Sequence, residues 1–215
     1  MTHIQGICLF LKGNIVMELS ERYEVFIKMV TNELGKMFLD QKEFIRCKEG
    51  CSYCCESGEY PFSKVEFEYL LKGFNALDNN KKETILNNLK SLNEQKQLSG
   101  DEPFMYKCPF LIDSKCSVYQ HRGIICRTFG LLVERNDGSF TLPFCYKRGL
   151  NYAKVHDDDS NKIIVEKAGK KLADTEPKAY RISRDAIQNL SLAHKLDITW
   201  GESKTLLDYM NEFMP

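Results

Sequence analysis

The sequence predicts a mainly α-helical protein with short β-hairpins, an α+β fold in which a small irregular domain is organised by metal. Three observations support this: apolar residues recur at helical spacing, turn residues separate pairs of short apolar stretches, and eight of nine cysteines lie between residues 47 and 145. We expect three segments that pack as one compact unit. They are an N-terminal segment and helix at 1–43, a cysteine-cluster metal-binding domain at 44–150 and a helical extension at 151–215.

Helices are predicted on both sides of the first cysteines. From Ser20 to about Glu43, apolar residues recur every three or four positions and give one buried stripe. Residues 46–61 contain glycine and proline without periodicity, as expected of a loop. Ser63 and Glu66 then form an S-x-x-E capping box, which predicts a second helix from about residue 64. Residues 80–98, with leucine and isoleucine on one face only, predict a third, largely exposed helix.

The cysteine-rich domain is expected to continue with hairpins. The apolar stretches 109–112 and 116–119 are separated by Asp-Ser-Lys, which predicts a tight turn between two strands. Residues 130–134 and 140–144, joined through Asn-Asp-Gly, predict a second hairpin. The segment 120–129 between them is expected to form a short helical turn.

The extension reads as a set of helices. Periodic apolar residues predict helices at about 160–173, 178–195 and 202–213, with a break at Asp197–Gly201. The polar run His156–Ser160 is expected to be a solvated loop before the first of them. Its adjacent aspartates lack the alternating spacing of a calcium loop.

The charge balance excludes some classes of function. Thirty basic residues accompany thirty acidic ones without a long basic run, so binding that depends on neutralising phosphates is not expected. No apolar stretch approaches the roughly 20 residues that cross a bilayer. We therefore expect neither nucleic acid nor membrane as a partner, whereas a protein partner or protein substrate stays open.

The N-terminal residues indicate the compartment. Residues 1–16 have no basic n-region, carry a lysine inside the apolar stretch and lack a small-residue cleavage site, unlike a secretory signal. We expect a cytoplasmic protein, whose reducing surroundings keep thiols free for metal. Translation could begin at Met1 or at Met17. Cys8, which stands apart from the other cysteines, is expected to be an ordinary buried thiol.

Four cysteines within nine residues form the pattern CxxxCxxCC in a polar, glycine-containing loop. Several thiolates held together repel one another, and a bound cation removes that repulsion. Zinc takes four thiolates at about 2.3 Å, so eight cysteines match two zinc sites, or one iron–sulfur cluster with a second metal. The predicted metal ligands are Cys47, Cys51, Cys54, Cys55, Cys108, Cys116, Cys126 and Cys145.

The partition of these thiols between metals is not readable from the sequence. The side chains of the adjacent Cys54 and Cys55 are expected to diverge, and so to serve different metals or the two sides of one cluster. His121 and His156 could each replace a cysteine, but the thiols suffice, and an exposed loop histidine is the commoner outcome.

The motifs also occur in a characteristic order. They are Cys47 to Cys55, Ser63 with Glu66, Cys108-Pro-Phe-Leu111, Cys116-Ser-Val-Tyr119 and Arg122-Gly-Ile-Ile-Cys126-Arg127. This order resembles the YkgJ-type cysteine-cluster family, described as zinc- or iron-chelating domains, over about residues 44–147. The resemblance implies a metal or iron–sulfur site formed by the motif cysteines, to which Cys145 is added on spacing alone. Gly123 stands where the family usually has proline, a departure that loosens a turn.

An alternative function uses S-adenosylmethionine. The related flagellin lysine N-methylases contain a similar cysteine module, which makes methyl transfer conceivable. Cys47, Cys51 and Cys54 also satisfy the radical signature, in which three thiolates leave one iron open to the cofactor. The helices and hairpins that follow lack the repeated strand–helix units of a barrel, which argues against a standard radical enzyme. No catalytic residue is assigned, because no hydrolase or phosphate-loop motif is present.

Overall fold

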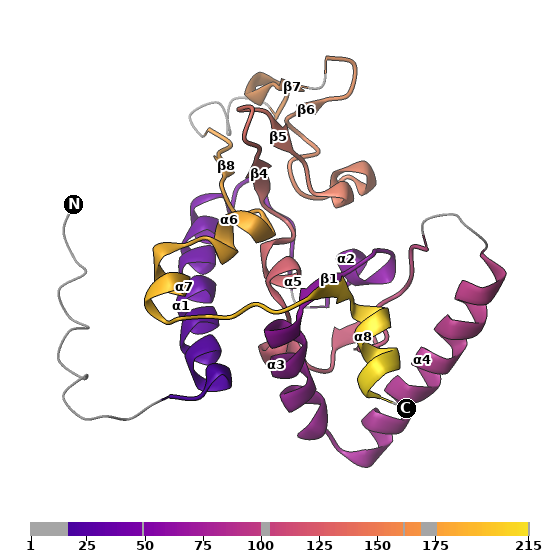
Figure 1. Cartoon of the computed structure of the whole chain (residues 1–215). Coiled ribbons are helices and arrows are strands. Elements are labelled where there is room, and N and C mark those ends of the chain that lie inside the picture. Colours follow the sequence, from indigo (N-terminus) through magenta and orange to yellow (C-terminus); the bar gives the residue numbers. More distant parts are fainter. Residues whose placement is uncertain (1–16, 49, 100–103, 161, 169–175, 215) are drawn as a thin grey trace.

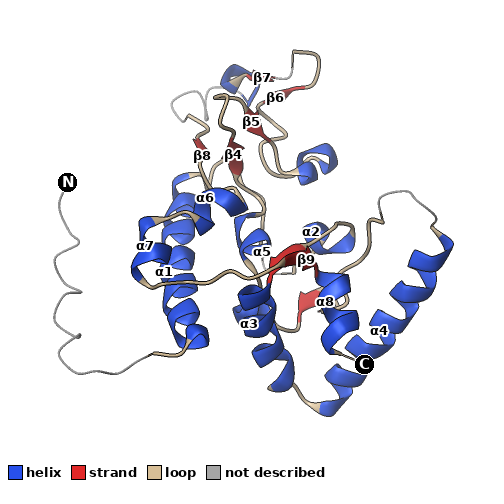
Figure 2. Cartoon of the chain, in the orientation of Figure 1, coloured by secondary structure: helices blue, strands red, loops and turns tan. Residues whose placement is uncertain are grey.

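The structure, a computed structural model, describes residues 17–48, 50–99, 104–160, 162–168 and 176–214. Helices make up most of its regular structure, and its strands are two or three residues long (Figure 2). The expected mainly α fold with short β elements is therefore confirmed. Cys8 and the alternative start at Met1 lie outside the described residues. Within the described ranges, no helix is long and apolar enough to cross a membrane.

The first helix, α1 (Leu19–Asp40), follows the predicted stripe. Tyr23, Phe26, Ile27 and Leu34 are among its buried side chains, and their spacing places them on one face. In Figure 1 this helix stands beside α5, α6 and α7, away from α4. The N-terminal helix predicted from the sequence is confirmed.

The helix after the cysteine cluster, α3 (Lys64–Asn75), lies between two hydrophobic cores. Phe67 and Phe74 belong to one core, together with residues of α4 and α8. Val65 and Tyr69 belong to the other, together with residues of α1. Because side chains of α3 pack in both cores, this helix fixes the position of each core relative to the cysteines.

The third helix, α4 (Asn79–Leu98), is confirmed with one buried face. Asp78 caps its first turn by accepting a hydrogen bond from a backbone N–H. Ile85, Leu89 and Leu92 are its buried residues and pack in the same core as α3. The remaining faces are polar, as the sequence predicts.

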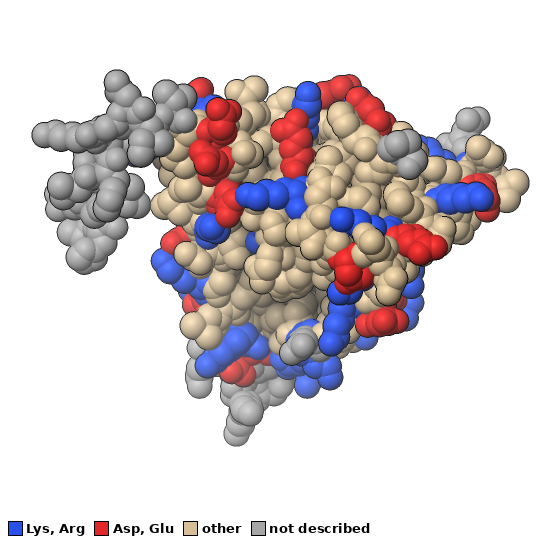
Figure 3. Space-filling view, turned by 90° about the horizontal axis from the view of Figure 1, so that it is seen from below, with Lys and Arg blue, Asp and Glu red and all other residues tan. Residues whose placement is uncertain are grey.

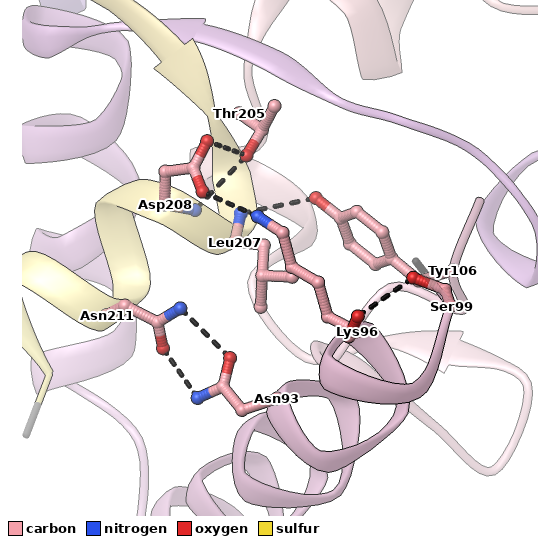
Figure 4. Close-up of polar contacts among 8 residues, drawn as sticks. All are labelled: Asn93, Lys96, Ser99, Tyr106, Thr205, Leu207, Asp208 and Asn211. Atoms are coloured by element: carbon pink, nitrogen blue, oxygen red, sulfur yellow. Dashed lines mark hydrogen bonds and ion pairs between the residues drawn. The ribbon is translucent and has the colours of Figure 1, made fainter. Parts of the chain in front are cut away.

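The last helix, α8 (Leu206–Phe213), packs against α4 (Figures 1 and 4). Lys96 Nζ lies 3.0 Å from Asp208 Oδ1, and a pair of asparagines exchanges side-chain hydrogen bonds across the same contact. The Leu207 N–H donates to the hydroxyl of Tyr106 at 3.2 Å. The C-terminal segment is therefore part of the core that lies beside the cysteines.

A two-stranded sheet fastens this segment to the chain that follows the cysteine cluster. β1 (Pro61–Ser63) pairs antiparallel with β9 (Ser203–Thr205), with Phe62 opposite Lys204. The helix expected over 202–213 thus begins only after β9, because these residues use their backbone groups in the sheet.

Both predicted hairpins are confirmed, with shorter strands. β2 (Leu111–Ile112) pairs with β3 (Lys115–Cys116), and both turn residues between them have positive φ, as a two-residue hairpin turn requires. β4 (Leu132–Glu134) pairs with β5 (Phe140–Thr141). The expected helical turn between the hairpins is a 3-10 turn, η1 (Tyr119–His121), followed by the short helix α5 (Ile124–Thr128).

The helix expected at 160–173 is wrong over its described part. β6 (His156–Asp157) and β7 (Lys162–Ile163) form a hairpin, and a 3-10 turn, η3 (Val165–Ala168), follows. Residues 169–175 lie outside the described part of the chain. The polar run expected to be a solvated loop begins instead with a buried strand residue, His156.

The helix expected at 178–195 is interrupted. β8 (Ala179–Tyr180) adds to β4 in parallel, then α6 (Arg184–Gln188) and α7 (Ser191–Lys195) follow as separate turns. Pairing with a distant strand overrides the local helical pattern here. The predicted break before residue 202 is confirmed, because the described chain there has no helix.

The face of the molecule seen in Figure 3 carries acidic and basic side chains interspersed with neutral ones. Among the described residues many charges are paired, as in the ion pair between Lys72 on α3 and Glu24 on α1. The mixture matches the zero net charge of the sequence.

The carboxylate of Glu66 is fully buried and joins three parts of the fold. Oε2 accepts from the N–H and hydroxyl of Ser63, at 2.9 and 2.8 Å, in the predicted capping box. Oε1 accepts from the Ile124 N–H, the first residue of α5, at 2.9 Å. Arg184 of α6 approaches Oε2 at 3.2 Å. A charge-assisted bond to each neighbour offsets the cost of burying the carboxylate.

We expect Glu66→Gln to lower the free energy of unfolding by on the order of 3 kcal/mol, because Arg184 then lacks its buried counter-ion and an acceptor becomes a donor. Urea unfolding under reducing conditions measures this loss. Glu212→Gln, at an exposed ion pair with Lys204, is the control and should leave the midpoint unchanged. Equal midpoints for wild type and Glu66→Gln would contradict the role of the buried carboxylate.

Candidate metal centre

The eight cysteines after residue 46 come from four neighbouring parts of the fold. Cys54 and Cys55 lie on a one-turn helix, α2 (Tyr53–Glu56), inside the segment expected to be an irregular loop. Cys47 and Cys51 precede that turn. Of the others, Cys116 lies on β3, Cys126 on α5 and Cys108 in the loop before β2. Cys145 lies on a 3-10 turn, η2 (Phe144–Arg148).

Backbone contacts bring the first cysteine segment against the second. The Cys108 N–H donates to the Cys55 carbonyl at 2.8 Å, and an isolated bridge pairs Gly58 with Tyr106. The Tyr60 hydroxyl donates to the carbonyl of Cys54 at 3.2 Å. α2 also contacts η2, which carries the last cysteine. The two groups of cysteines, distant in sequence, therefore meet around α2.

The sulfurs of Cys54 and Cys55 lie 3.9 Å apart. The expectation that these adjacent side chains diverge is therefore wrong, because the helical turn of α2 holds them together. Four sulfurs bound to one tetrahedral zinc ion at about 2.3 Å lie about 3.8 Å from each other. The observed separation thus suits two ligands of the same metal.

Cys54 is electrostatically coupled to five other cysteines. Its negative charge, when ionised, raises the pKa of Cys47, Cys145, Cys108, Cys116 and Cys126. Within the described ranges, no three histidine, cysteine, aspartate or glutamate side chains are arranged to hold a metal ion as they stand.

Burial keeps the metal-free thiols protonated at neutral pH. Desolvation raises the pKa of Cys126 to about 12 and that of Cys145 to about 11. It also raises the pKa of Cys108 and Cys116, whereas the hydrogen bond with Cys55 is the main cause of the raised pKa of Cys54. A cation that stabilises thiolates would reverse this balance by charge attraction.

Hydrogen-bond donors already point at several sulfurs. The Phe110 N–H donates to Cys108 and the Val118 N–H to Cys116, and each bond lowers the pKa of its thiol. In both cases the donor lies two residues after the cysteine. Such bonds stabilise the thiolate that binds metal, so the donor set fits a soft or borderline cation such as zinc or iron.

Arg122 supplies a positive charge beside the second group of sulfurs. Its charge lowers the pKa of Cys54, Cys116 and Cys126, and its guanidinium lies over the ring of Tyr119, with Cζ 3.7 Å from the centroid. Sequence reasoning included this arginine only as part of a motif and assigned it no role.

Gly123 occupies a position where side-chain volume is excluded. It caps α5 with φ of −69°, a value that proline also adopts. A Cβ at this residue would lie 2.6 Å from Cε1 of Phe62 and 3.2 Å from Oε1 of Glu66. The turn expected to be loosened by glycine is thus packed tightly, and the ring of Phe62 fills the space that proline would need.

The two candidate histidines pack against aromatic rings. The ring of His121 lies 4.8 Å from that of Tyr69. His156 is buried, contrary to the expected exposed loop position, with its ring 4.7 Å from that of Tyr146. Neither ring contact involves a cysteine, so the thiols remain the candidate ligands.

The comparisons with known proteins bear on the cysteine domain. Residues 46–146 match the model of the CxxCxxCC family, described as a putative zinc- or iron-chelating domain. Neither a curated protein nor a solved structure matches the chain. Both the matched span and the cysteine motifs agree with the resemblance found in the sequence, so residues 46–146 are similar to this zinc- or iron-chelating family.

Proposed function

We propose that this protein binds zinc or iron through its eight clustered cysteines, in a cytoplasmic setting that keeps the thiols reduced. The observation that carries the proposal is the contact between the two cysteine segments at α2, where the Cys108 N–H donates to the Cys55 carbonyl and the sulfurs of Cys54 and Cys55 lie 3.9 Å apart. Disulfides are not formed among the described cysteines. The match to a chelating domain supports the same conclusion.

Two groups of ligands lie on either side of α2 in this proposal. The charge of Cys51 raises the pKa of Cys47 and Cys145, and the charge of Cys116 raises the pKa of Cys108 and Cys126. Cys54 acts on members of both groups, and Cys55 lies beside it. The eight thiolates are enough for two adjacent four-coordinate sites, or for one cluster and a single metal ion, with Cys54 and Cys55 in the same site.

The metal would join segments that the polypeptide alone connects weakly. Cys47 and Cys51 are exposed, and Cys145 lies on a short 3-10 turn. The short strands of the fold are too few to hold these segments in place. Zinc would supply a purely structural link there, whereas iron would add electron transfer.

The S-adenosylmethionine alternative receives no separate support. The largest sheet among the described residues has three strands, which is far from the barrel of a standard radical enzyme. A methyltransferase built on the cysteine module stays a question for cofactor binding, which calorimetry with S-adenosylmethionine addresses directly.

One experiment tests the metal proposal. The protein is purified without oxygen, its visible spectrum is recorded, and zinc, iron and acid-labile sulfide are measured per chain. Colourless protein with about two zinc ions would identify two thiolate sites, whereas brown protein with stoichiometric sulfide would identify an iron–sulfur cluster. Protein that contains no metal and takes up neither zinc nor iron would refute the proposal.

Cys54→Ser should lose most of the bound metal, because this sulfur lies between both groups. The melting temperature of the metal-treated protein should fall toward that of the chelator-treated wild type. Elemental analysis and thermal unfolding measure the two effects. Cys8→Ser is the matched control and should retain full metal content; equal retention by Cys54→Ser would show that this sulfur is not a ligand.

Metal-free protein should become less stable as pH rises above about 9. In the unfolded chain thiols ionise near pH 9, whereas folded Cys126 and Cys145 hold their protons to about pH 12 and 11. The unfolded state therefore loses protons first, and each such thiol lowers the free energy of unfolding by up to about 1.4 kcal/mol per pH unit. Urea midpoints at pH 8 and 10, with chelator and reductant present, measure this slope.

Cys126→Ser provides the control for this pH effect, because it removes one of the buried thiols. Its urea midpoint should fall less between pH 8 and 10 than that of wild type. Identical falls would show that burial of this thiol does not control the pH dependence. Zinc affinity should change in the opposite direction and increase with pH, since the ligands must lose protons to bind.

A further inference from the structure

Asn151 is a fully buried residue beyond the matched domain, yet it contacts two of the candidate ligands. Its side-chain Nδ2 lies 3.2 Å from the sulfur of Cys47. Its backbone N–H lowers the pKa of the Cys145 thiol. One residue thus acts on two cysteines that are far apart in sequence.

The orientation of the Asn151 amide is set by its other partners. Oδ1 accepts from the Arg46 N–H at 2.7 Å, and Nδ2 donates to the Gly130 carbonyl at 2.8 Å. A flipped amide would place a donor against the Arg46 N–H and an acceptor against the Gly130 carbonyl. The second hydrogen of Nδ2 is therefore directed to the sulfur of Cys47.

The Asn151 amide fits against the backbone at residue 130 only because that residue is glycine. Gly130 has φ of 107°, in the region that favours glycine. A Cβ there would lie 2.9 Å from Nδ2 of Asn151 and 3.1 Å from the sulfur of Cys47. The absence of a side chain at residue 130 thus allows the segments at residues 47, 130 and 151 to approach one another closely.

We propose that Asn151 is a positioning residue of the metal centre, which orients the sulfurs of Cys47 and Cys145 and stabilises them as thiolates by N–H···S hydrogen bonds. This inference rests on the proposed metal-binding function and extends the centre into the segment that follows the matched domain. Groups that hold metal ligands in place from outside the coordination shell typically change metal affinity 10- to 100-fold when altered.

The main test uses Asn151→Asp, which keeps the size of the side chain and an acceptor for the Arg46 N–H. It replaces the Nδ2 donor by an oxygen facing the Cys47 sulfur. Zn²⁺ affinity, measured by competition with a chromophoric chelator on anaerobically reduced protein, should fall about 10- to 100-fold. The sulfur-to-cobalt charge-transfer absorption of the Co²⁺-loaded protein should weaken as well, a change that lost stability alone would not produce.

Gln41→Glu is the matched control, because Gln41 is also a buried amide but its partners are Lys178, Glu176, Asp40 and Tyr152, with no sulfur among them. It should leave zinc affinity unchanged even if stability falls. In a Cys47→Ser background, the further loss of zinc affinity caused by Asn151→Asp should shrink or disappear, since the residue it acts through is gone.

Unchanged zinc affinity in Asn151→Asp, an equal loss in Gln41→Glu, or an undiminished loss in the Cys47→Ser background would each overturn the inference. If Asn151→Asp does not fold, Asn151→Ala removes the donor without adding charge. Wild-type protein loaded with cadmium gives an independent measurement by nuclear magnetic resonance: a scalar coupling between an Asn151 Nδ2 proton and the metal supports the inference, and its absence overturns it. Wild-type protein that binds no Zn²⁺ would refute the proposed function itself, a result distinct from failure of this inference.

Discussion

The buried carboxylate of Glu66 is the interaction on which the rest of the structure depends. It caps α3, holds the first N–H of α5 and pairs with an arginine of α6, so three segments meet at one charged group. A carboxylate without solvent is tolerated only when its oxygens are satisfied, and here each oxygen has a donor. The orientation of α5, and with it the place of Cys126, follows from this network.

Two hydrophobic cores share α3, and the sulfurs lie where those cores end. Cys108, Cys116 and Cys126 pack against the core of α3, α4 and α8. Cys47 and Cys51 are exposed and belong to neither main core. Cys108, Cys116 and Cys126 are therefore supported by core packing, whereas the sulfur of Cys47 contacts the amide of Asn151. A metal bound by both groups of cysteines would hold in place the exposed group, which core packing does not support.

Local signals in the sequence were sufficient for much of the fold. The capping box at Ser63 and the turn between β2 and β3 involve neighbouring residues, so their structures follow from short-range chemistry. Strands β8 and β9 pair with partners more than a few dozen residues away, and strands this short have no periodicity to reveal them.

The candidate site likewise has some features that the sequence predicts and others that only the fold determines. The cysteines proposed as ligands stand out in the sequence by their number and spacing, and backbone contacts bring their two segments together at α2. The approach of the Cys54 sulfur to that of Cys55 depends on the helical turn α2. A helix of four residues is too short to give a periodic pattern in the sequence. Asn151 carries no sequence signal, because a single asparagine becomes informative only when folding places it against a sulfur.

The pairing of β1 with β9 also bears on how the protein is made. A ribosome adds residues in order, so β9, which pairs beside the cysteine cluster, and Arg184, which balances Glu66, are supplied only after residues 46–146 have all emerged. During that interval the buried carboxylate lacks its counter-charge and the thiols are less protected. Metal bound as proposed would therefore stabilise the nascent chain most before β9 and Arg184 have been synthesised.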